Sequence, residues 1–104
     1  MILNHVWKGM DLLSSVLTPR IHTQLLPDSI DVEDQTLAIG QTLTADDEVV
    51  KLLQHKGHHN VSYKDKGFSC TQFIAIQYID DGLGGVRVEA VADPRKDGRP
   101  AIWV

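Results

Sequence analysis

The sequence predicts an α+β fold with helices and a mostly antiparallel sheet. Two segments, residues 2–17 and 45–56, show apolar residues at helical spacing. Two β-prone runs, 71–79 and 86–92, are joined by "DDGLGG", and an antiparallel hairpin is the simplest connection through such a turn. Helices grouped apart from an antiparallel hairpin are typical of the α+β class rather than of the alternating α/β class.

The first helical segment contains a weak point and a clear end. Gly9 lowers helix propensity in its middle, and Asp11 is placed to cap a second part. Pro19 disfavours a helical backbone at Thr18, so we expect the helix to stop there. No capping residue precedes Ile2, which we interpret as a sign of an element entered part-way. The expected apolar stripe comprises Leu3, Val6, Trp7, Met10, Leu12, Leu13, Val16 and Leu17.

The next segment is predicted to connect the first helix to a short strand. Pro19 and Pro27 bracket residues that suit neither a helix nor a central strand. Beyond them, Ile30 and Val32 alternate with acidic residues, which predicts a short, half-exposed strand.

The second helix, Ala45–Lys56, has the strongest local signals in the sequence. Thr44 is the predicted N-cap, and acidic residues fill the first turn, where the helix dipole favours anions. Gly57 is placed to end the helix. A short strand at "NVSY" follows it. The predicted buried stripe comprises Val49, Val50, Leu52 and Leu53.

The last two strands differ in pattern. The run "TQFIAIQYI" is nearly apolar on both faces, as expected for a sheet covered on both sides. The run "VRVEAVA" alternates Val86, Val88 and Ala90 with charged residues, so one of its faces is expected to meet water or a polar layer.

Bulk composition narrows the function classes. The 104 residues suffice for one small domain, which we predict to span the whole chain, 1–104. A net charge of −4 argues against a nucleic-acid partner, whose phosphates need a basic face. No apolar run approaches a membrane span, and no targeting signal is visible. The single cysteine, Cys70, is expected to be a small buried apolar residue.

Three short motifs favour ordinary structural interpretations over chemistry. His55, His58 and His59 lie close in sequence, but Gly57 separates them and no acidic or cysteine partner follows at a regular interval, so a polar helix end is favoured over a metal site. The glycines of "DDGLGG" precede a strand rather than a helix, which favours a turn over a phosphate-binding loop. Asn60 begins an "NVS" sequon, meaningful only in a secretory pathway. No nucleophile–base pair is evident.

Two stretches, at opposite ends of the chain, resemble one known family. "NHVWKGMDLLSSVLTPRIHTQLLPDSIDVED" is similar to a helix with a G-M-D/S-L step that leads into a P-R-x-H-x-Q-x-x-P turn and an acidic strand. "VRVEAVADPRKDGRPAIWV" is similar to a closing A-x-D-x-R-K-x-G segment. Together they resemble the C-terminal half of the small subunit of γ-glutamyltranspeptidase, or glutathione hydrolase. The matching positions are Gly9, Met10, Asp11, Pro19, Arg20, His22, Gln24, Leu26 and Pro27, then Ala92, Asp93, Arg95, Lys96, Gly98 and Pro100.

The resemblance implies part of an N-terminal-nucleophile hydrolase, a four-layer αββα sandwich. Such enzymes cut their own precursor to expose a Thr whose hydroxyl attacks the γ-glutamyl carbonyl, with its α-amine as base. The substrates are glutathione and γ-glutamyl compounds, and the acyl group passes to water, amino acids or peptides. No cofactor is implied. Family members are commonly secretory, periplasmic or vacuolar.

The family's catalytic and substrate-binding residues lie upstream of the matched region, so no catalytic, substrate-binding or metal residue is predicted in this chain. Met1 has no hydroxyl, and Gly84 and Gly85 are not the family's oxyanion glycines. We therefore predict that the chain alone is inactive and that its partner is the complementary upstream part of the enzyme. Two alternatives stay open: a non-catalytic truncated paralogue that acts as a binding module, and an unrelated α+β domain with chance motifs.

The tail is predicted to be a structural latch rather than an anion site. Asp93 and Pro94 would end the last strand in a turn, while Arg95 and Lys96 would make ion pairs or carbonyl contacts and Gly98 would permit the next turn. The end, Ile102-Trp103-Val104, departs from the Gly-Tyr common in the family. The residues predicted to have family-specific structural roles are Pro19, Arg20, His22, Asp93, Arg95, Lys96 and Gly98.

Overall fold

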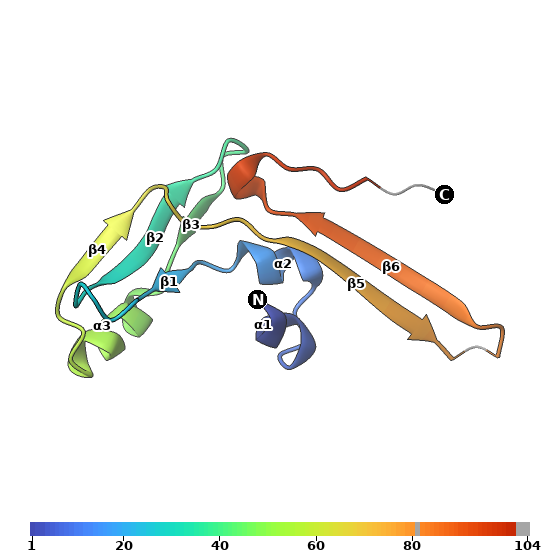
Figure 1. Cartoon of the computed structure of the whole chain (residues 1–104), viewed down its shortest axis with the longest axis horizontal. Helices are drawn as coiled ribbons and strands as arrows, with labels where there is room; N and C mark the ends of the chain where they lie inside the picture. The colour runs from blue at the N-terminus through green and yellow to red at the C-terminus, as the bar shows by residue number, and fades with distance from the viewer. Residues whose placement is uncertain (81, 102–104) are drawn as a thin grey trace. The chain divides into compact units, whose positions relative to one another are not determined.

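The computed structural model describes residues 1–80 and 82–101, which form two compact units (Figure 1). We call residues 19–69 the sheet unit. Residues 1–18 together with 70–101 form the hairpin unit, so its two parts come from opposite ends of the chain. Both units combine helix with mainly antiparallel strands, which confirms the predicted α+β class.

The sheet unit is organised around one central strand, β2 (Ile30–Thr36). Strands β1 (Ile21–His22) and β3 (Thr42–Thr44) pair with β2 in antiparallel orientation, whereas β4 (Val61–Lys64) pairs with it in parallel. The strand predicted at Ile30 is therefore confirmed, but it lies at the centre of a four-stranded sheet rather than half-exposed.

The core of the sheet unit lies between β2 and helix α3 (Asp47–His55). Side chains alternate between the faces of a strand, so Ile30 and Val32 share one face of β2. Both are buried, and they pack with Ala45 and Val50. Partly buried residues complete this cluster: Ile21, Leu53 and Val61.

Helix α3 is confirmed, but its start differs from the prediction. Asp46 is the N-cap, and its carboxylate accepts a hydrogen bond of 2.8 Å from the Glu48 N–H. The prediction of Thr44 as the cap is wrong. Thr44 belongs to β3, a strand that the sequence did not indicate, and pairs there with Asp34 of β2. Val50 is buried, whereas the other predicted stripe residues Val49 and Leu52 are exposed.

The hairpin unit contains the predicted antiparallel hairpin. Strand β5 (Gln72–Ile79) pairs with β6 (Gly85–Ala92) along its whole length, from Gln72 opposite Ala92 to Ile79 opposite Gly85. Of the predicted turn, residue 81 lies outside the described residues, and the turn glycines Gly82 and Gly84 have positive φ values of 74° and 71°. Such angles suit glycine because it lacks a Cβ.

The N-terminal helical segment is split in two. Helix α1 (Ile2–Val6) and helix α2 (Leu12–Leu17) are separated at Gly9, which has a φ of 69°. As predicted, Asp11 caps α2, accepting a hydrogen bond of 2.9 Å from the Ser14 N–H, and the helix ends before Pro19. Leu12 and Val16 of α2 are buried, but α1 has no buried residue, so the apolar stripe is only partly covered.

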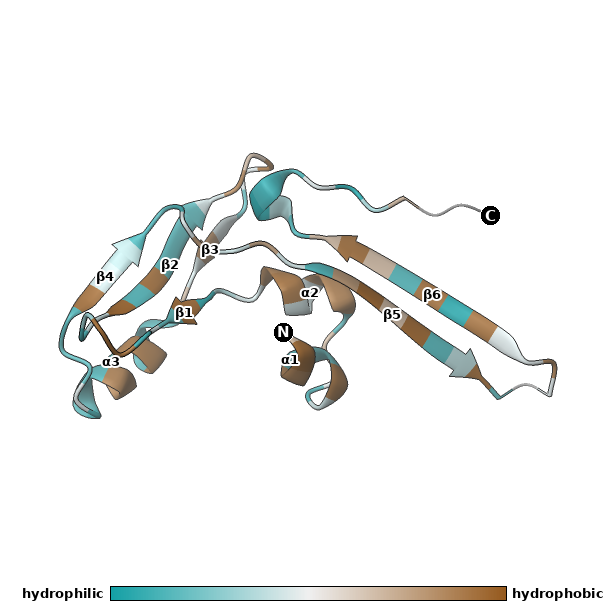
Figure 2. Ribbon diagram, viewed as in Figure 1, coloured by the Kyte–Doolittle hydropathy of each residue, from teal (hydrophilic) through white to brown (hydrophobic). Residues whose placement is uncertain are grey.

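One face of the hairpin is apolar and exposed, contrary to the expectation of cover on both sides. Ile76 lies opposite Val88 and Tyr78 opposite Val86, so these side chains share a face, and Ile76 and Tyr78 are 59% and 81% exposed. The ring of His5 contacts Phe73, which points to the other face. In Figure 2, brown and teal bands alternate along β6, whereas brown dominates the first part of β5. The apolar hairpin face comprises Ile74, Ile76, Tyr78, Val86 and Val88.

Two further observations concern the predicted burial of Cys70 and the search for membrane-spanning helices. Cys70 is exposed, so its predicted burial is wrong. Among the described residues, no helix has both the length and the apolar character to cross a membrane.

The Asp11 cap predicts an acid-sensitive contribution to stability. Hydrogen bonds from the Ser14 side chain and the Ser14 backbone hold the pKa of the Asp11 carboxyl below its usual value of 3.8. A carboxyl with a lower pKa in the folded state stabilises the fold fully above its unfolded pKa, and this contribution is lost as pH falls through the folded pKa. Asn also caps helices but does not titrate.

We therefore expect the stability difference between the wild type and Asp11→Asn to be constant above about pH 5, and to shift in favour of the variant below the unfolded pKa. Urea unfolding followed by circular dichroism at a series of pH values measures this difference. Parallel acid dependences of the two proteins would contradict the assigned role of Asp11.

Candidate functional site

The residues predicted to form the latch meet at the end of β6. The strand ends at Ala92, and Asp93 caps the short 3₁₀ helix η1 (Pro94–Lys96) by accepting a hydrogen bond of 3.1 Å from the Arg95 N–H. The second carboxylate oxygen of Asp93 accepts a hydrogen bond of 3.0 Å from the Thr71 N–H. Asp93 is completely buried, so its negative charge depends on these donors and on a cationic partner.

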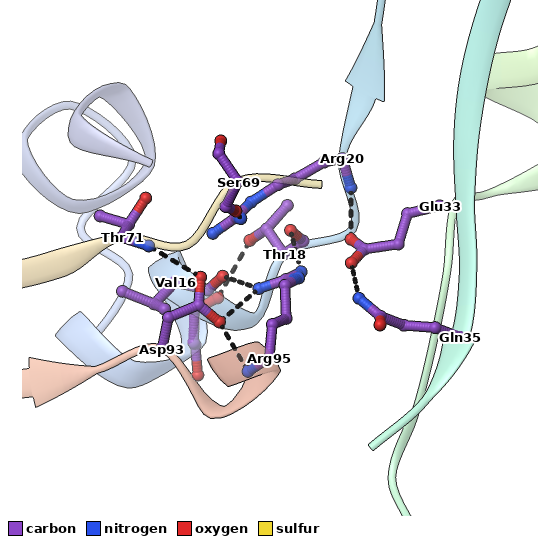
Figure 3. Close-up of polar contacts among 10 residues, drawn as sticks. Val16, Thr18, Arg20, Glu33, Gln35, Ser69, Thr71, Asp93 and Arg95 are labelled. Carbon is purple, nitrogen blue, oxygen red and sulfur yellow. Dashed lines mark hydrogen bonds and ion pairs between the residues drawn. The ribbon is translucent and has the colours of Figure 1, made fainter. Parts of the chain in front are cut away.

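Arg95 supplies that positive charge and extends the cluster to helix α2 (Figure 3). Its Nη1 lies 3.1 Å from Asp93 Oδ1 and donates to the Val16 carbonyl oxygen at 2.9 Å, while Nη2 donates to the Thr18 carbonyl oxygen at 3.4 Å. The side chain is 2% exposed. The last carbonyls of a helix lack partners within the helix, so Arg95 satisfies two of them and places a cation at the negative end of the helix dipole.

The Asp93–Arg95 cluster therefore joins three stretches of the hairpin unit: the end of α2, the start of β5 and the turn after β6. Arg95 makes both contacts expected from the sequence, an ion pair and carbonyl hydrogen bonds. Among the described residues, no buried side-chain nitrogen or oxygen lacks a hydrogen-bond partner. Chemically, the cluster is a set of mutually satisfied donors and acceptors, an arrangement suited to holding backbone segments.

A second polar cluster lies within the sheet unit, around Glu33 of β2. One Glu33 carboxylate oxygen accepts a hydrogen bond of 2.9 Å from the Arg20 N–H, and the other accepts from the Gln35 side-chain amide. Glu33 is completely buried. The Arg20 guanidinium donates to the Ser69 carbonyl oxygen, so this cluster ties the two ends of the sheet unit together (Figure 3).

The remaining predicted residues take peripheral positions. His22 pairs opposite Asp31 at the edge of the sheet, its Nε2 lies 3.4 Å from Gln24 Oε1, and its side chain is exposed. Pro19 directly precedes Arg20. Lys96 is exposed on η1.

Gly98 does not provide the turn that we assigned to it. The left-handed residue after η1 is Asp97, with a φ of 52°. A Cβ at Gly98 would lie 3.2 Å from the Ala92 Cβ and 3.3 Å from the Gln72 side-chain nitrogen. A side chain at position 98 would therefore be tight against the end of the hairpin, and these neighbours would have to shift by a few tenths of an ångström.

The histidines of the predicted helix end and the Asn60 sequon lie mostly at the surface. His55 and His59 are exposed and His58 is half-buried. Among residues 1–80 and 82–101, no group of three His, Cys, Asp or Glu side chains is placed to hold a metal ion. Asn60 is exposed, and its side-chain amide donates to the Asp28 carbonyl oxygen at 2.8 Å.

Comparison with known proteins finds a matching family model and a relative of this chain. A family model described as gamma-glutamyltranspeptidase matches residues 1–103. Glutathione hydrolase 2 of Arabidopsis thaliana is 36% identical over 100 residues, which are 95% of this chain and 17% of the plant protein. The chain thus spans a small part of that relative.

Three solved structures share the fold. A mutant of Helicobacter pylori gamma-glutamyltranspeptidase superposes with a TM-score of 0.66 at 23% identity, over 90% of this chain and 44% of that one. An acivicin-inhibited gamma-glutamyltranspeptidase gives 0.64 at 26% identity, over 93% and 45%. The Pseudomonas nitroreducens enzyme complexed with L-DON gives 0.53 at 27% identity, over 99% and 46%.

These matches confirm the resemblance to the family, and they show that this chain shares its α+β fold with N-terminal-nucleophile hydrolases. The family model extends across both units, from residue 1 to residue 103. The chain belongs to the gamma-glutamyltranspeptidase family.

Proposed function

We propose that this chain is the C-terminal part of the small subunit of an enzyme that hydrolyses glutathione and transfers γ-glutamyl groups to water, amino acids or peptides. The family match over residues 1–103 carries this proposal. The similarity to a plant glutathione hydrolase supports the substrate class. Because the chain spans less than half of each solved relative, the activity is assigned to the whole protein.

The chain contributes structure rather than the nucleophile to this reaction. The buried Asp93 and Arg95 side chains are engaged in holding the backbone. The acyl-transfer step needs a hydroxyl nucleophile with a base beside it. We assign that Thr and its α-amine to the complementary upstream part of the enzyme.

The apolar hairpin face is the surface that this upstream part would cover. Ile76 and Tyr78 are mostly exposed, and Val86 and Val88 continue the same face on β6. Burying apolar surface contributes about 25 cal/mol per Å². Two sheets that pack face to face interdigitate such side chains at a spacing of about 10 Å. A second sheet from the upstream part would therefore find a matching surface here.

A γ-glutamyl-anilide release assay tests the proposed function. We expect no release above the buffer rate from the purified 104-residue chain, and release when it is refolded together with the complementary upstream segment. The upstream segment alone is the matched control. Turnover by this chain alone would contradict the assignment of the nucleophile, and stable association without turnover would contradict the assignment of γ-glutamyl transfer.

The exposed hairpin face also supports a second function, that of a non-catalytic binding module. Apolar faces and strand edges invite partners. Size-exclusion chromatography tests what both functions share: concentration-dependent association supports an exposed binding face, whereas a monomer with a cooperative melt argues against both this face and a need for a missing half. Release of the γ-glutamyl-anilide after refolding with the complementary segment then separates the two functions.

A further inference from the structure

The sheet unit has an open hollow of about 630 Å³ that the proposed function does not use. This volume falls within the range of small-molecule sites, about 300–1,000 Å³. Its wall includes Arg20, His22, Asp31, Lys64 and Lys66, and the segment Gly67–Ser69 closes one side.

The hollow involves the sheet face opposite the core. Ile30 and Val32 point toward α3, so Asp31, between them, points away. His22 pairs opposite Asp31. The Lys64 Nζ lies 4.0 Å from Asp31 Oδ1, which brings the end of this lysine to the same face. The topology of β1, β2 and β4 thus gathers charged side chains that are distant in sequence.

The charge in the hollow is positive although the whole chain is acidic. The lining includes three cationic residues, Arg20, Lys64 and Lys66, and one acidic residue, Asp31, in a chain of net charge −4. The Lys64–Asp31 pair is long, and its side chains are 46% and 39% exposed. Asp31 offsets one of these three charges, so the lining keeps more positive than negative charge. A concave region of one sign concentrates ligands of the opposite sign.

We propose that this hollow binds a compact anion through a carboxylate or phosphate group. Lys64 and Lys66 supply the charge, because ammonium groups make short, strong hydrogen bonds to ionised oxygens. Arg20 shapes the wall, since its guanidinium donates to the Ser69 carbonyl oxygen. Ile21 and Phe68 provide apolar surface for the body of an organic anion. This binding is independent of the proposed γ-glutamyl chemistry.

Titration of the ¹⁵N-labelled 104-residue chain with inorganic phosphate or with succinate, at constant ionic strength, tests the proposal by NMR. We expect saturable shifts confined to the backbone amides of residues 20–22, 31 and 64–69. The double variant Lys64→Gln/Lys66→Gln should bind about tenfold more weakly. Lys64→Arg/Lys66→Arg should retain binding. Tighter binding of phosphate or of succinate identifies the preferred oxygen group, and either result supports the site.

The matched control is Lys51→Gln/Lys56→Gln, which removes the same charge from α3 and its C-cap, outside the hollow. It should bind as the wild type does. Equal weakening by the control pair, or shifts that never saturate in either anion, would overturn the proposal, because both indicate non-specific attraction. If the glutamine pair loses signal dispersion, Lys66→Gln alone is judged by the same criteria.

Discussion

Replacing Arg95 by Ala is expected to lower the free energy of unfolding by about 3–5 kcal/mol, because it leaves a buried carboxylate without its cation. Asp93 is completely buried and the Arg95 side chain is 2% exposed, so water cannot replace the lost charge. The substitution also removes the donors to the Val16 and Thr18 carbonyl oxygens at the end of α2. Urea unfolding of the chain, assembled with its complementary segment, measures the loss.

The control for this prediction lies one residue away. Lys96 is exposed on the same 3₁₀ helix, so Lys96→Ala should change stability by less than about 0.5 kcal/mol. Arg95→Lys keeps the charge but loses the planar fork that reaches several oxygens, so it should fall between the two. The folded fraction of the Arg95→Ala enzyme should retain acyl transfer. A variant of normal stability that has lost acyl transfer would reject the structural role.

The elements predicted correctly are those whose signals are local. Helix α3 has acidic residues in its first turn and Gly57 after its end, and the β5–β6 hairpin has matched β-prone runs around a glycine turn. Capping and turn formation depend on neighbours within a few residues, so the sequence carries them directly. The Asp11 cap was predicted on the same basis.

The predictions that were wrong concern non-local facts. Thr and Asp are both residue types that favour the N-cap position, so the sequence alone does not choose between Thr44 and Asp46. The choice is made because Thr44, in β3, pairs with Asp34 of β2, which leaves Asp46 to cap the helix. Likewise, the apolar pattern of β5 predicts cover on both faces but not whether the described chain supplies it. Exposure of Cys70 depends on the same tertiary context.

The two polar clusters show why the sequence predicts the charged residues of a site but not their partners. Asp93 and Arg95 stand out as charged residues around a proline, but their partners are the backbone atoms of Val16, Thr18 and Thr71. Every residue type carries a backbone carbonyl and, except proline, a backbone N–H. The side chains at those positions therefore do not indicate that their backbone atoms make these hydrogen bonds. In the sequence, Glu33 is only one of the acidic residues of a predicted strand. Its complete burial is a consequence of the fold.

The apolar hairpin face carries the second large prediction, which concerns assembly rather than stability of the chain. Ile76 is 59% exposed, so Ile76→Asp should leave the folded chain nearly unchanged. In a complex that covers this face, the same substitution would bury an unpaired carboxylate, at a cost of several kcal/mol. We expect about hundredfold weaker association with the complementary segment, and a proportional loss of restored γ-glutamyl transfer.

The matched control is Gln77→Asp, which places the same charge on the neighbouring residue of β5. Successive strand residues point to opposite faces, so this change leaves the apolar hairpin face intact. Titration of each variant with the complementary segment, read by isothermal calorimetry, should show tight binding for Gln77→Asp and weak binding for Ile76→Asp. Equal affinities would mean that a different surface joins the two parts, and the sheet-to-sheet contact would then have to be assigned to other strands.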